Sequence, residues 1–463
     1  MRTAGTSGMA GTAGTVGRAR AVGAVAADGP VEATGTANRP LGQALARRSL
    51  LAGAAAAGVG IAGGAAGDAV AAGRPRTVTQ RAVDAEAERL RRGLIALRQD
   101  LHRHPEAPGQ ERRTAGVVAR QLRAAGLDVV TGVGGNGVVG VLRGARPGRT
   151  IAYRADMDAV PPQDIVGGGP ATAHVCGHDL HTTIALGVAH VLARLRRQLS
   201  GTAVFLFQPA EEALAGARAM IDAGVLERTR VEEIHALHCG PFPVGQFAVT
   251  PGYGLPGQDH AQVTIAGPDA PDTAGRLASA IGALATVTPP QTPADLERMV
   301  ADVRTPHGPL NRFVAVRARV RDATVSVSSR CWPQERYPEV RAGIRRLAAS
   351  YAGATVSFPT DPFPAMVCPE RDARALAHHL RRALGRDAVT ELHAAFPFNG
   401  EDFALYLDRV PGTYTFLGVR APNSPLTTCF PHYPDFAPDE RAIGIGVRAM
   451  AGWIAQRAAS APH

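Results

Sequence analysis

The sequence lacks lysine: all 50 of the basic side chains among its 463 residues are arginine. This absence excludes a P-loop, in which a lysine contacts the phosphates, and every reaction that passes through a lysine Schiff base. Charged residues are also sparse, at 19% against 45% hydrophobic, which indicates a globular chain and not a disordered one. The length allows two or three domains.

Acidic residues are fewer than basic ones, which gives a formal net charge of +10. Six arginines and three acids lie in the first 73 residues and account for +3 of this charge, so +7 remains for the rest of the chain. The remaining arginines are scattered among acids along expected helices, as on an ordinary solvated surface. We therefore expect no nucleic-acid partner.

Residues 1–73 differ in composition from the rest of the chain. The first 46 are rich in Gly, Ala and Thr without periodicity, which predicts disorder. Arg47-Arg48 then precede a weakly apolar run, and Ala69-Val70-Ala71 resemble a cleavage site. This order is typical of a twin-arginine signal and predicts export to the cell envelope or the extracellular space; a chance arginine pair before an Ala-rich linker is the alternative. The run is too rich in glycine for a stable membrane span.

Cysteine is scarce and odd in number. In an exported protein an odd count leaves one thiol for another task, and we expect Cys176, which lies in a histidine cluster, to be that thiol. The pairing of the other four stays open: Cys239, Cys331, Cys368 and Cys429.

Hydrophobic periodicity predicts an α/β sheet with some parallel pairing. Helices are expected over Val83 to His102, Thr114 to Ala125 and Thr182 to Leu199, and strands over Gly137 to Leu142, Thr150 to Arg154, Thr202 to Phe207 and Ile234 to Leu237. Acids or imidazoles follow three of these strands, namely Asp156 and Asp158, Glu211 and Glu212, and His238. Because ligands bind beyond the carboxyl ends of strands in open α/β sheets, we expect these side chains to meet.

A Gly- and Pro-rich break at residues 251–257 predicts an inserted unit. We expect a small α+β domain there, with strands at Gln262 to Ile265, Phe313 to Arg319, Ala323 to Ser328 and Thr355 to Phe358, and helices at Thr273 to Ala285, Ala294 to Val303 and Pro338 to Tyr351. Helices at 370–385 and Asp439 to Gln456 then return to the first pattern. The expected divisions are a leader (1–73), a catalytic domain in two parts (74–253 and 365–463) and the insertion (254–364).

The chemistry is concentrated between Ala173 and Glu212. Ala-His-Val-Cys-Gly-His-Asp-Leu-His (173–181) supplies thiol and imidazole groups, and Glu211-Glu212 supply two adjacent carboxylates. Thiolate, imidazole and carboxylate are the ligands of zinc-type metals, and a spare carboxylate beside them is what metal-assisted hydrolysis needs as a base. The sequence therefore predicts a metallohydrolase.

Seven motifs follow one another along the chain: residues 101–106, Arg154 to Pro161, Cys176 to His181, Gln208 to Glu212, Leu237-His238, Gly400 to Phe403 and His432 to Phe436. In this order they resemble the M20 metallopeptidase family, in particular its amidohydrolase branch of hippurate hydrolases and N-acyl amino acid aminoacylases. The resemblance implies a zinc-peptidase-like α/β/α catalytic domain interrupted by a ferredoxin-like α+β lid domain. In this family the lid often dimerises, so a homodimer is expected.

The same resemblance assigns roles to single residues. It implies two divalent metal ions, zinc or manganese with cobalt or nickel as further candidates, held by Cys176, His178, Glu212, His238 and His432. It makes Glu211 the general base that takes a proton from the metal-activated water and passes it to the leaving amine. Asp156, Asp158 and His181 are expected to support the ligands from behind.

Several residues in or beside the motifs are expected to have roles other than metal binding. His102 and His104 are expected to be structural. Of the adjacent pair His238 and Cys239, only one is expected to reach the site, since neighbouring strand residues point to opposite faces. Glu401 and Asp402 either cap the following helix or shape the pocket, and both readings stay open.

The chain departs from the family in the insertion. The family's lid carries a histidine, in a Gly-x-Gly-Gly-His pattern, that is thought to stabilise the oxyanion in the partner subunit's site; residues 266–272 contain no histidine. Because an oxyanion donor can contribute roughly 3–4 kcal/mol, this loss bears on activity. His260, His307 or the metals are candidate substitutes. Asn311 and Arg330 resemble the family's substrate-binding residues, and an arginine fork suits a carboxylate.

The expected function is hydrolysis of the amide bond in N-acyl amino acids or similar small conjugates. Two alternatives remain: a metal-binding homologue with weak or no turnover, because of the changed lid, and a dipeptidase or carboxypeptidase that differs only in substrate.

Overall fold

The computed structural model describes residues 77–461. The predicted leader and export signal therefore lie outside the described residues. Within the described part of the chain, no helix combines the length and the apolar character that a membrane crossing requires.

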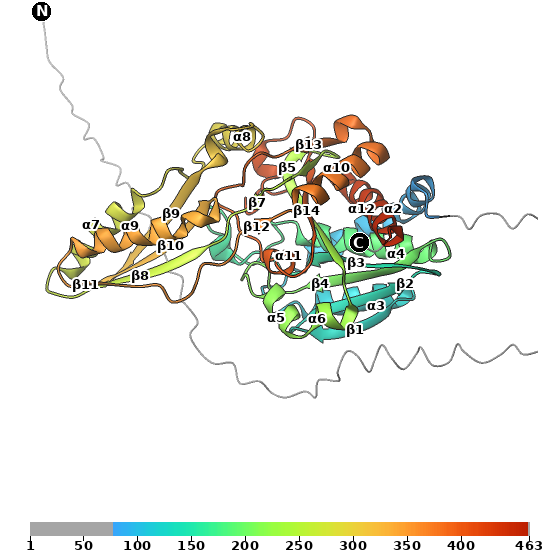
Figure 1. Ribbon diagram of the computed structural model, residues 1–463, viewed down its shortest axis with the longest axis horizontal. Coiled ribbons are helices and arrows are strands. Elements are labelled where there is room, and N and C mark those ends of the chain that lie inside the picture. The colour runs from blue at the N-terminus through green and yellow to red at the C-terminus, as the bar shows by residue number, and fades with distance from the viewer. Residues whose placement is uncertain (1–76, 462–463) are drawn as a thin grey trace, which may run out of the picture. The chain divides into compact units, whose positions relative to one another are not determined.

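Eight strands form the large sheet, in the spatial order β1-β2-β4-β3-β5-β14-β6-β13 (Figure 1). Its central strands β4, β3, β5 and β14 are mutually parallel, whereas β1 and β2 are antiparallel additions at one edge. Parallel strands that are covered on both faces have nearly continuous apolar sequences. Strand β5 is covered in this way, since ten of its eleven residues are buried. The strands are β1 (Asp128–Val133), β2 (Gly137–Arg143), β3 (Arg146–Asp156), β4 (Ser200–Gln208), β5 (Glu233–Pro243), β6 (Phe247–Val249), β13 (Val389–Glu391) and β14 (Gly412–Arg420).

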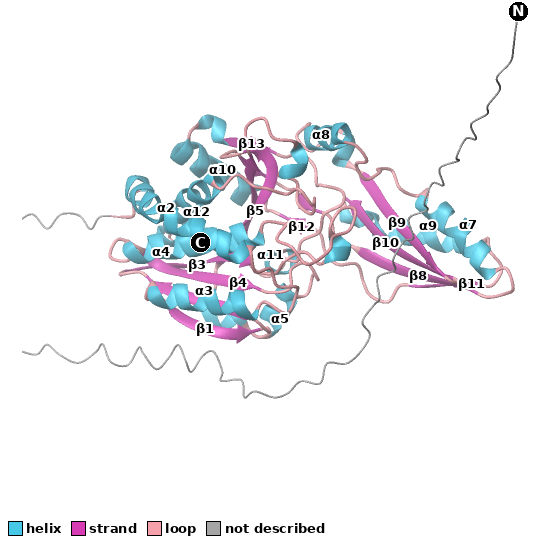
Figure 2. Cartoon of the chain, turned by 180° about the vertical axis from the view of Figure 1, so that it is seen from behind, coloured by secondary structure: helices cyan, strands magenta, loops and turns pink. Residues whose placement is uncertain are grey.

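Helices cover this sheet, and α2, α4 and α12 pack side by side against β3 and its neighbours (Figure 2). Their buried side chains and those of the strands belong to one hydrophobic core. Helix α2 begins where the Thr79 hydroxyl accepts the backbone N–H of Ala82. The helices of this part are α2 (Gln80–His102), α3 (Arg112–Ala124), α4 (His178–Arg194), α5 (Gly216–Asp222), α6 (Val225–Thr229), α10 (Glu370–Leu384), α11 (Ala404–Leu407) and α12 (Arg441–Ala459).

Four further strands form the small sheet, in the order β11-β8-β10-β9 with every neighbouring pair antiparallel. Together with two helices this is the β-α-β-β-α-β arrangement of a ferredoxin-like unit. The elements are β8 (Asp259–Ile265), α7 (Ala270–Gly282), β9 (Phe313–Arg321), β10 (Thr324–Trp332), α9 (Tyr337–Ala349) and β11 (Ala354–Ser357). Helices α7 and α9 share a second hydrophobic core with one face of the small sheet.

Helix α8 (Pro293–Asp302) lies within the predicted insertion but packs elsewhere. Its buried residues Leu296, Met299 and Val300 belong to the core of the large sheet. A two-stranded ribbon of β7 (Gly254–Leu255) and β12 (Met366–Val367) joins the two ends of the inserted segment. The α/β class with an inserted α+β unit is therefore as predicted, whereas α8 belongs by its packing to the larger part.

Two predicted boundaries were wrong in ways that concern the chemistry. Strand β5 does not end at Leu237 but continues to Pro243, so His238 lies inside the strand. Helix α4 begins at His178 and not at Thr182, because Gly177 takes a φ of +89° that sets the first turn directly after Cys176. Strands β1, β6, β13 and β14 were not predicted.

Candidate metal centre

The predicted site residues converge beyond the carboxyl end of β3. Asp156 ends β3 and pairs with Gln208, the last residue of β4, so the loops that carry Asp158 and Glu211 leave the sheet together. Strand β5 runs past this point, and its register with β3 (Arg154 opposite Ala236) sets His238 level with Asp156. The mid-strand position of His238 therefore still delivers it to the expected edge of the sheet.

Three histidines are held in one tautomer by backbone carbonyls. Nδ1 donates to Asp158 O in His178 (2.9 Å), to Cys239 O in His238 (2.8 Å) and to Asp164 O in His432 (2.9 Å). A carbonyl can only accept, so each Nδ1 carries a hydrogen, and Nε2 is the ring nitrogen left for a metal ion once it has lost its own proton. Metal-binding histidines are commonly oriented in this way.

Two of the Nε2 atoms face a thiol and a carboxylate. His238 Nε2 lies 3.5 Å from Cys176 Sγ, and His432 Nε2 lies 3.3 Å from Glu212 Oε2. The donor atoms of Cys176, His178 and His238 all lie within 4.8 Å of one another, as do those of Cys176, Glu212 and His432. Cys176 belongs to both groups, so one sulfur lies beside two places where a cation fits.

Two of these donor atoms, His178 Nε2 and Glu212 Oε1, are buried without a hydrogen-bond partner among residues 77–461. Buried polar atoms in native proteins nearly always have a partner, and an ion is one explanation for such an exception. The donor set of one thiol, three imidazoles and one carboxylate suits zinc-type divalent cations. The residues present therefore fit a two-metal centre.

The chain's own charges set the protonation of these ligands. Burial, with Glu212 and Glu211 nearby, raises the pKa of Cys176. Burial lowers the pKa of His178, but the charges of Asp156 and Asp158 outweigh this effect and raise the pKa to about 10. Cations must displace the protons from Cys176 and His178, so we expect metal affinity to rise with pH.

Glu211 stands apart from the ligands in its surroundings. Its Oε2 lies 3.8 Å from His178 Nε2, and its side chain is almost fully buried. Burial, followed by the charges of Glu401 and Glu212, raises the pKa of Glu211 well above its usual range. In contrast, burial raises the pKa of Glu212 but His432 and His178 outweigh it and lower it to about 2. The two adjacent carboxylates are thus suited to different tasks, one to hold a proton and one to remain ionised.

The predicted supporting residues do hold the histidines. Asp158 Oδ1 lies 3.3 Å from His178 Nδ1, and Asp158 Oδ2 accepts the backbone N–H of Glu212 (2.9 Å). His181 Nδ1 donates to Asp156 Oδ1 (2.7 Å), while its Nε2 accepts the backbone N–H of Cys239 (2.8 Å). Both ring nitrogens of His181 are therefore engaged by the chain, which fits a supporting role.

The expectation that only one of His238 and Cys239 would reach this region was wrong. The Cys239 thiol lies 2.9 Å from His181 Nε2, and the donor atoms of His181, His238 and Cys239 lie within 4.8 Å of one another. The missing side chain of Gly177 leaves the space that this thiol occupies, since a Cβ there would lie only 2.1 Å from Cys239 Sγ. All five cysteines are buried and unpaired in the described chain.

An unpredicted role belongs to Arg154, which is 1% exposed. Its guanidinium donates to Asp156 (2.5 Å), Glu401 (2.9 Å) and Asp402 (3.0 Å), and its Nε donates to Gln208 (2.9 Å). Glu401 and Asp402 were predicted either to cap the following helix or to shape the pocket, and neither prediction describes Asp402 fully. Asp402 accepts the backbone N–H of Ala217 in α5 (2.9 Å) and does not cap its own helix. The one feature of the sequence that could have indicated this role is an arginine two residues before Asp156.

The loop that carries His432 is held by backbone bonds to two other loops. His432 has a φ of +70°, its N–H donates to Val175 O (2.8 Å), and its carbonyl accepts the N–H of Val166 (2.8 Å). A left-handed conformation in a residue other than glycine is strained and is typically found at functional sites. These contacts link three distant segments at the cluster.

A second unpredicted residue, Glu111, orients the turn before Glu211. Its Oε1 accepts the N–H of Ala210, a residue with φ +52°, at 2.9 Å, and Asn136 donates to its Oε2 at 3.0 Å. Glu111 lies in a loop before α3 and no pattern in the sequence marks it.

Arg330 and Asn311, the two residues predicted to bind substrate, have different surroundings. Arg330 on β10 donates to Gln258 (2.6 Å) and lies so close to Gly400 that a Cβ there would meet its Nη1 at 2.4 Å. The Asn311 amide, oriented to satisfy both of its polar atoms, bridges the backbones of His393 (2.8 Å) and His307 (3.2 Å). Substrate binding by either residue stays a prediction.

His102 and His104 have structural partners. His102 Nδ1 lies 2.8 Å from the buried carboxylate of Asp179, and His104 Nδ1 donates to Asp100 O at 2.8 Å.

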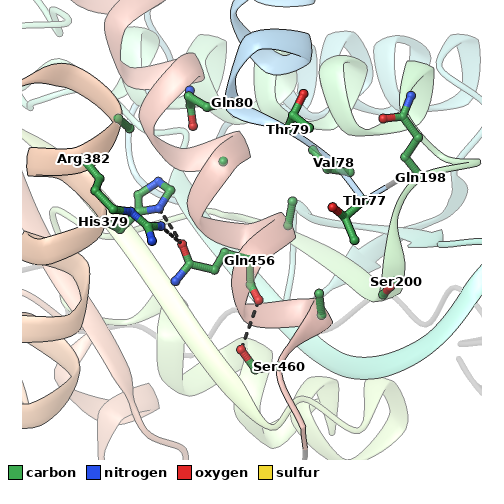
Figure 3. Close-up of a pocket in the computed structure, with 14 residues that line it drawn as sticks. Thr77, Val78, Thr79, Gln80, Gln198, Ser200, His379, Arg382, Gln456 and Ser460 are labelled. Atoms are coloured by element: carbon green, nitrogen blue, oxygen red, sulfur yellow. Dashed lines mark hydrogen bonds between the residues drawn. The ribbon is translucent and has the colours of Figure 1, made fainter. Parts of the chain in front are cut away.

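A cavity of about 610 Å³ lies elsewhere, between α2, α10 and α12 (Figure 3). Gln456 there accepts hydrogen bonds from His379 (2.8 Å) and Arg382 (3.0 Å). It shares no lining residue with the metal cluster.

Known proteins resemble this chain over most of its length. Residues 152–456 match the model of peptidase family M20/M25/M40. N-acetylcysteine deacetylase of Bacillus subtilis is 30% identical over 376 residues, 77% of this chain and 95% of that protein. N-acetyldiaminopimelate deacetylase of Enterococcus faecalis is 28% identical over 380 residues, 78% and 97% of the two chains. The crystal structure of a dinuclear metal-binding M20 peptidase from Bacillus subtilis matches with a TM-score of 0.59 and 27% identity, covering 80% of this chain and 98% of that one.

Proposed function

The chain belongs to peptidase family M20/M25/M40, and from that premise we propose that it hydrolyses the amide bond of N-acyl amino acids or similar small conjugates with two divalent metal ions. The membership makes it a metallohydrolase. The narrower reaction is supported by two relatives that are named as deacetylases of N-acetylated amino acids.

One observation carries the proposal: three imidazoles with carbonyl-bound Nδ1 atoms turn their Nε2 atoms toward Cys176 and Glu212. Cys176, His178, His238, Glu212 and His432 would hold the two ions, for which we propose zinc or manganese. When bound, the ions would supply Lewis-acid activation of the attacking water and of the amide carbonyl.

Glu211 is the proton carrier of the proposed reaction. It accepts a proton from the attacking water and returns it to the nitrogen of the leaving amine, so that no amide anion has to leave. Its burial and the neighbouring acids favour the protonated form, which makes it a good donor in the second step. Arg154 opposes those acids and is the charge that lowers the pKa of Glu211, allowing it to accept the proton in the first step.

Arg330 binds the carboxylate of the amino acid in this proposal. Its guanidinium has no ion-pair partner among residues 77–461, and its hydrogen bonds run to Gln258 and Gly257. Burial lowers the pKa of Arg330 to about 10, so the side chain is still a cation at neutral pH. A desolvated arginine of this kind is suited to a carboxylate.

The test is hydrolysis of a panel of acetyl, benzoyl and longer acyl amino acids by metal-loaded protein. We expect turnover in the wild type, and in Glu211→Gln a fall in kcat of about 10²–10⁴ with unchanged metal content. Tight ligand binding without turnover in the wild type would instead favour the non-catalytic homologue. Cleavage restricted to free peptides would favour the dipeptidase or carboxypeptidase.

We also propose export by the twin-arginine route and a homodimer formed through the inserted unit. The Arg47-Arg48 pair and the weakly apolar run after it support the first. Arg47→Lys together with Arg48→Lys should abolish export in a fractionated host, and sedimentation should give twice the chain mass.

A further inference from the structure

The small sheet has one covered face and one open face. Alternate residues of β8, Ala261, Val263 and Ile265, pack with α7 and α9, while His260, Gln262 and Thr264 between them are exposed. Directly paired residues of antiparallel strands share a face, which places the partners of the exposed set on the open face as well. Figure 1 shows α7 and α9 beside these strands.

The register orders the open face into rows. Ser328 on β10 pairs with both Arg317 on β9 and His260 on β8, and Ser326 pairs with Arg319 and Gln262. Arg330 pairs with Ala315 in the row before them. The strand residues of this face include no Asp or Glu in the described chain; they are His260, Gln262, Thr264, Phe313, Ala315, Arg317, Arg319, Arg321, Thr324, Ser326, Ser328, Arg330, Trp332, Thr355 and Ser357. Phe313, Ala315 and Trp332 are buried, so the face is open from the row of Arg317 onward.

Arg317 and Arg319, the arginine pair, are exposed cations without a counterion at contact distance. Neither has a hydrogen-bond or ion-pair partner among residues 77–461. Residues two apart on a strand point to the same side, about 7 Å from each other. The pair therefore presents two guanidinium forks to one side of the sheet, with Ser328 directly opposite Arg317 and Ser326 directly opposite Arg319 on β10.

This face looks toward the metal cluster. Arg330 lies against Gly400, next to Glu401, and feels the charge of Glu211. The charges of Arg319 and Arg317 both act on Asp164, whose carbonyl holds His432. Arg330 therefore approaches the acids beside the cluster, and the arginine pair lies within electrostatic range of the loop that holds His432.

We propose that the arginine pair is a second anion subsite, so that the preferred substrates are N-acyl derivatives of dicarboxylic amino acids. This inference rests on the proposed function, in which Arg330 takes the α-carboxylate. Arg317 is a diagonal neighbour of Arg330 across the two strands, about 7–8 Å away, a gap that two long side chains and a dicarboxylic amino acid span. Each guanidinium can bind a carboxylate in two hydrogen bonds.

Asp164 competes with the substrate for this pair but does not neutralise it. No ion pair of at most 4.0 Å joins Asp164 to either arginine, and one carboxylate against two guanidinium groups leaves a net positive charge. Exposed charges on an edge strand also discourage pairing with other chains. If the arginines only discouraged such pairing, they would not make the protein prefer one substrate over another.

Calorimetry on metal-loaded Glu211→Gln protein tests the subsite without turnover. The ligands are N-acetyl-L-glutamate and N-acetyl-L-glutamine, which have nearly the same size and differ by one charge. We expect the glutamate derivative to bind about tenfold more tightly or better, the value of one charged hydrogen-bonded contact. Arg317→Gln combined with Arg319→Gln should remove this preference and leave the affinity for the glutamine derivative within about twofold.

Arg276→Gln combined with Arg346→Gln is the matched control. Both residues are exposed on α7 and α9, the helices that pack on the covered face, so the variant loses the same charge from the other side. We expect it to keep the preference. Equal affinities of the two ligands, no binding of the glutamate derivative, or an equal loss in both double variants would overturn the subsite. Failure of the proposed function is a separate result, namely wild-type protein that hydrolyses no acyl amino acid.

Discussion

Replacement of Arg154 by methionine is the most informative single change, because it removes the one cation shared by three buried acids. Arg154 is 1% exposed and its guanidinium lies 2.5 Å from Asp156, 2.9 Å from Glu401 and 3.0 Å from Asp402. Removing one partner of a buried ion pair costs about 3–5 kcal/mol, since the other charge stays buried. We expect a loss of at least that size for Arg154→Met at neutral pH.

The loss should shrink as the pH falls. Burial raises the pKa of Asp402 to about 7 even with Arg154 opposing it. Without the arginine the folded variant keeps this proton to a higher pH than the folded wild type does, so above about pH 7 the stability of the variant falls with pH more steeply than that of the wild type. The difference in unfolding free energy between variant and wild type should thus be smaller at pH 5 than at pH 8.

Urea unfolding of both proteins at the two pH values measures this, with Arg149→Met as the control. Arg149 lies on the same strand, is 4% exposed and binds Glu233 (2.8 Å), but Arg457 also binds Glu233 (2.7 Å), so the acid keeps a partner. We expect a smaller loss of unfolding free energy in Arg149→Met than in Arg154→Met. A loss under about 1 kcal/mol in Arg154→Met, or one that grows at low pH, would refute the account of this network.

Two further changes test the supports of the cluster and a remote charge. Asp158→Asn should weaken metal affinity about 10–100-fold in a chelator titration, whereas Asp164→Asn, which touches His432 only through its backbone carbonyl, should not; equal effects would contradict these roles. Burial raises the pKa of Glu233, but His235 and Arg457 outweigh it and hold it well below its usual range. Its contribution is therefore present above about pH 4 and lost below, so Glu233→Gln should be less stable at pH 7 and approach the wild type as the pH falls; a constant deficit would contradict this.

The fold class was predictable because strands and helices alternate with clear periodicity, and the structure confirms it. The exact strand ends were not, because β5 is buried along nearly its whole length and carries no pattern that marks where pairing stops. Strand β14 was missed although its core is apolar, since only its parallel pairing with β5 distinguishes it from a buried helix segment.

The candidate ligands were predictable from residue type and spacing, together with the family resemblance. The backbone carbonyls of Asp158, Cys239 and Asp164 that orient the histidines were not predictable, because every residue possesses such a group. The arginine pair likewise emerged only from the register of β9 with β10, which places Arg317 and Arg319 on the face that carries Arg330.

Anomalous diffraction from crystals of the zinc-loaded protein is the most direct test of the metal centre. We predict two anomalous peaks, both beside Cys176 Sγ, one shared with His178 and His238 and the other with Glu212 and His432. Peaks at other side chains, or none at this cluster in protein that retains zinc, would contradict the assignment of these five residues as ligands.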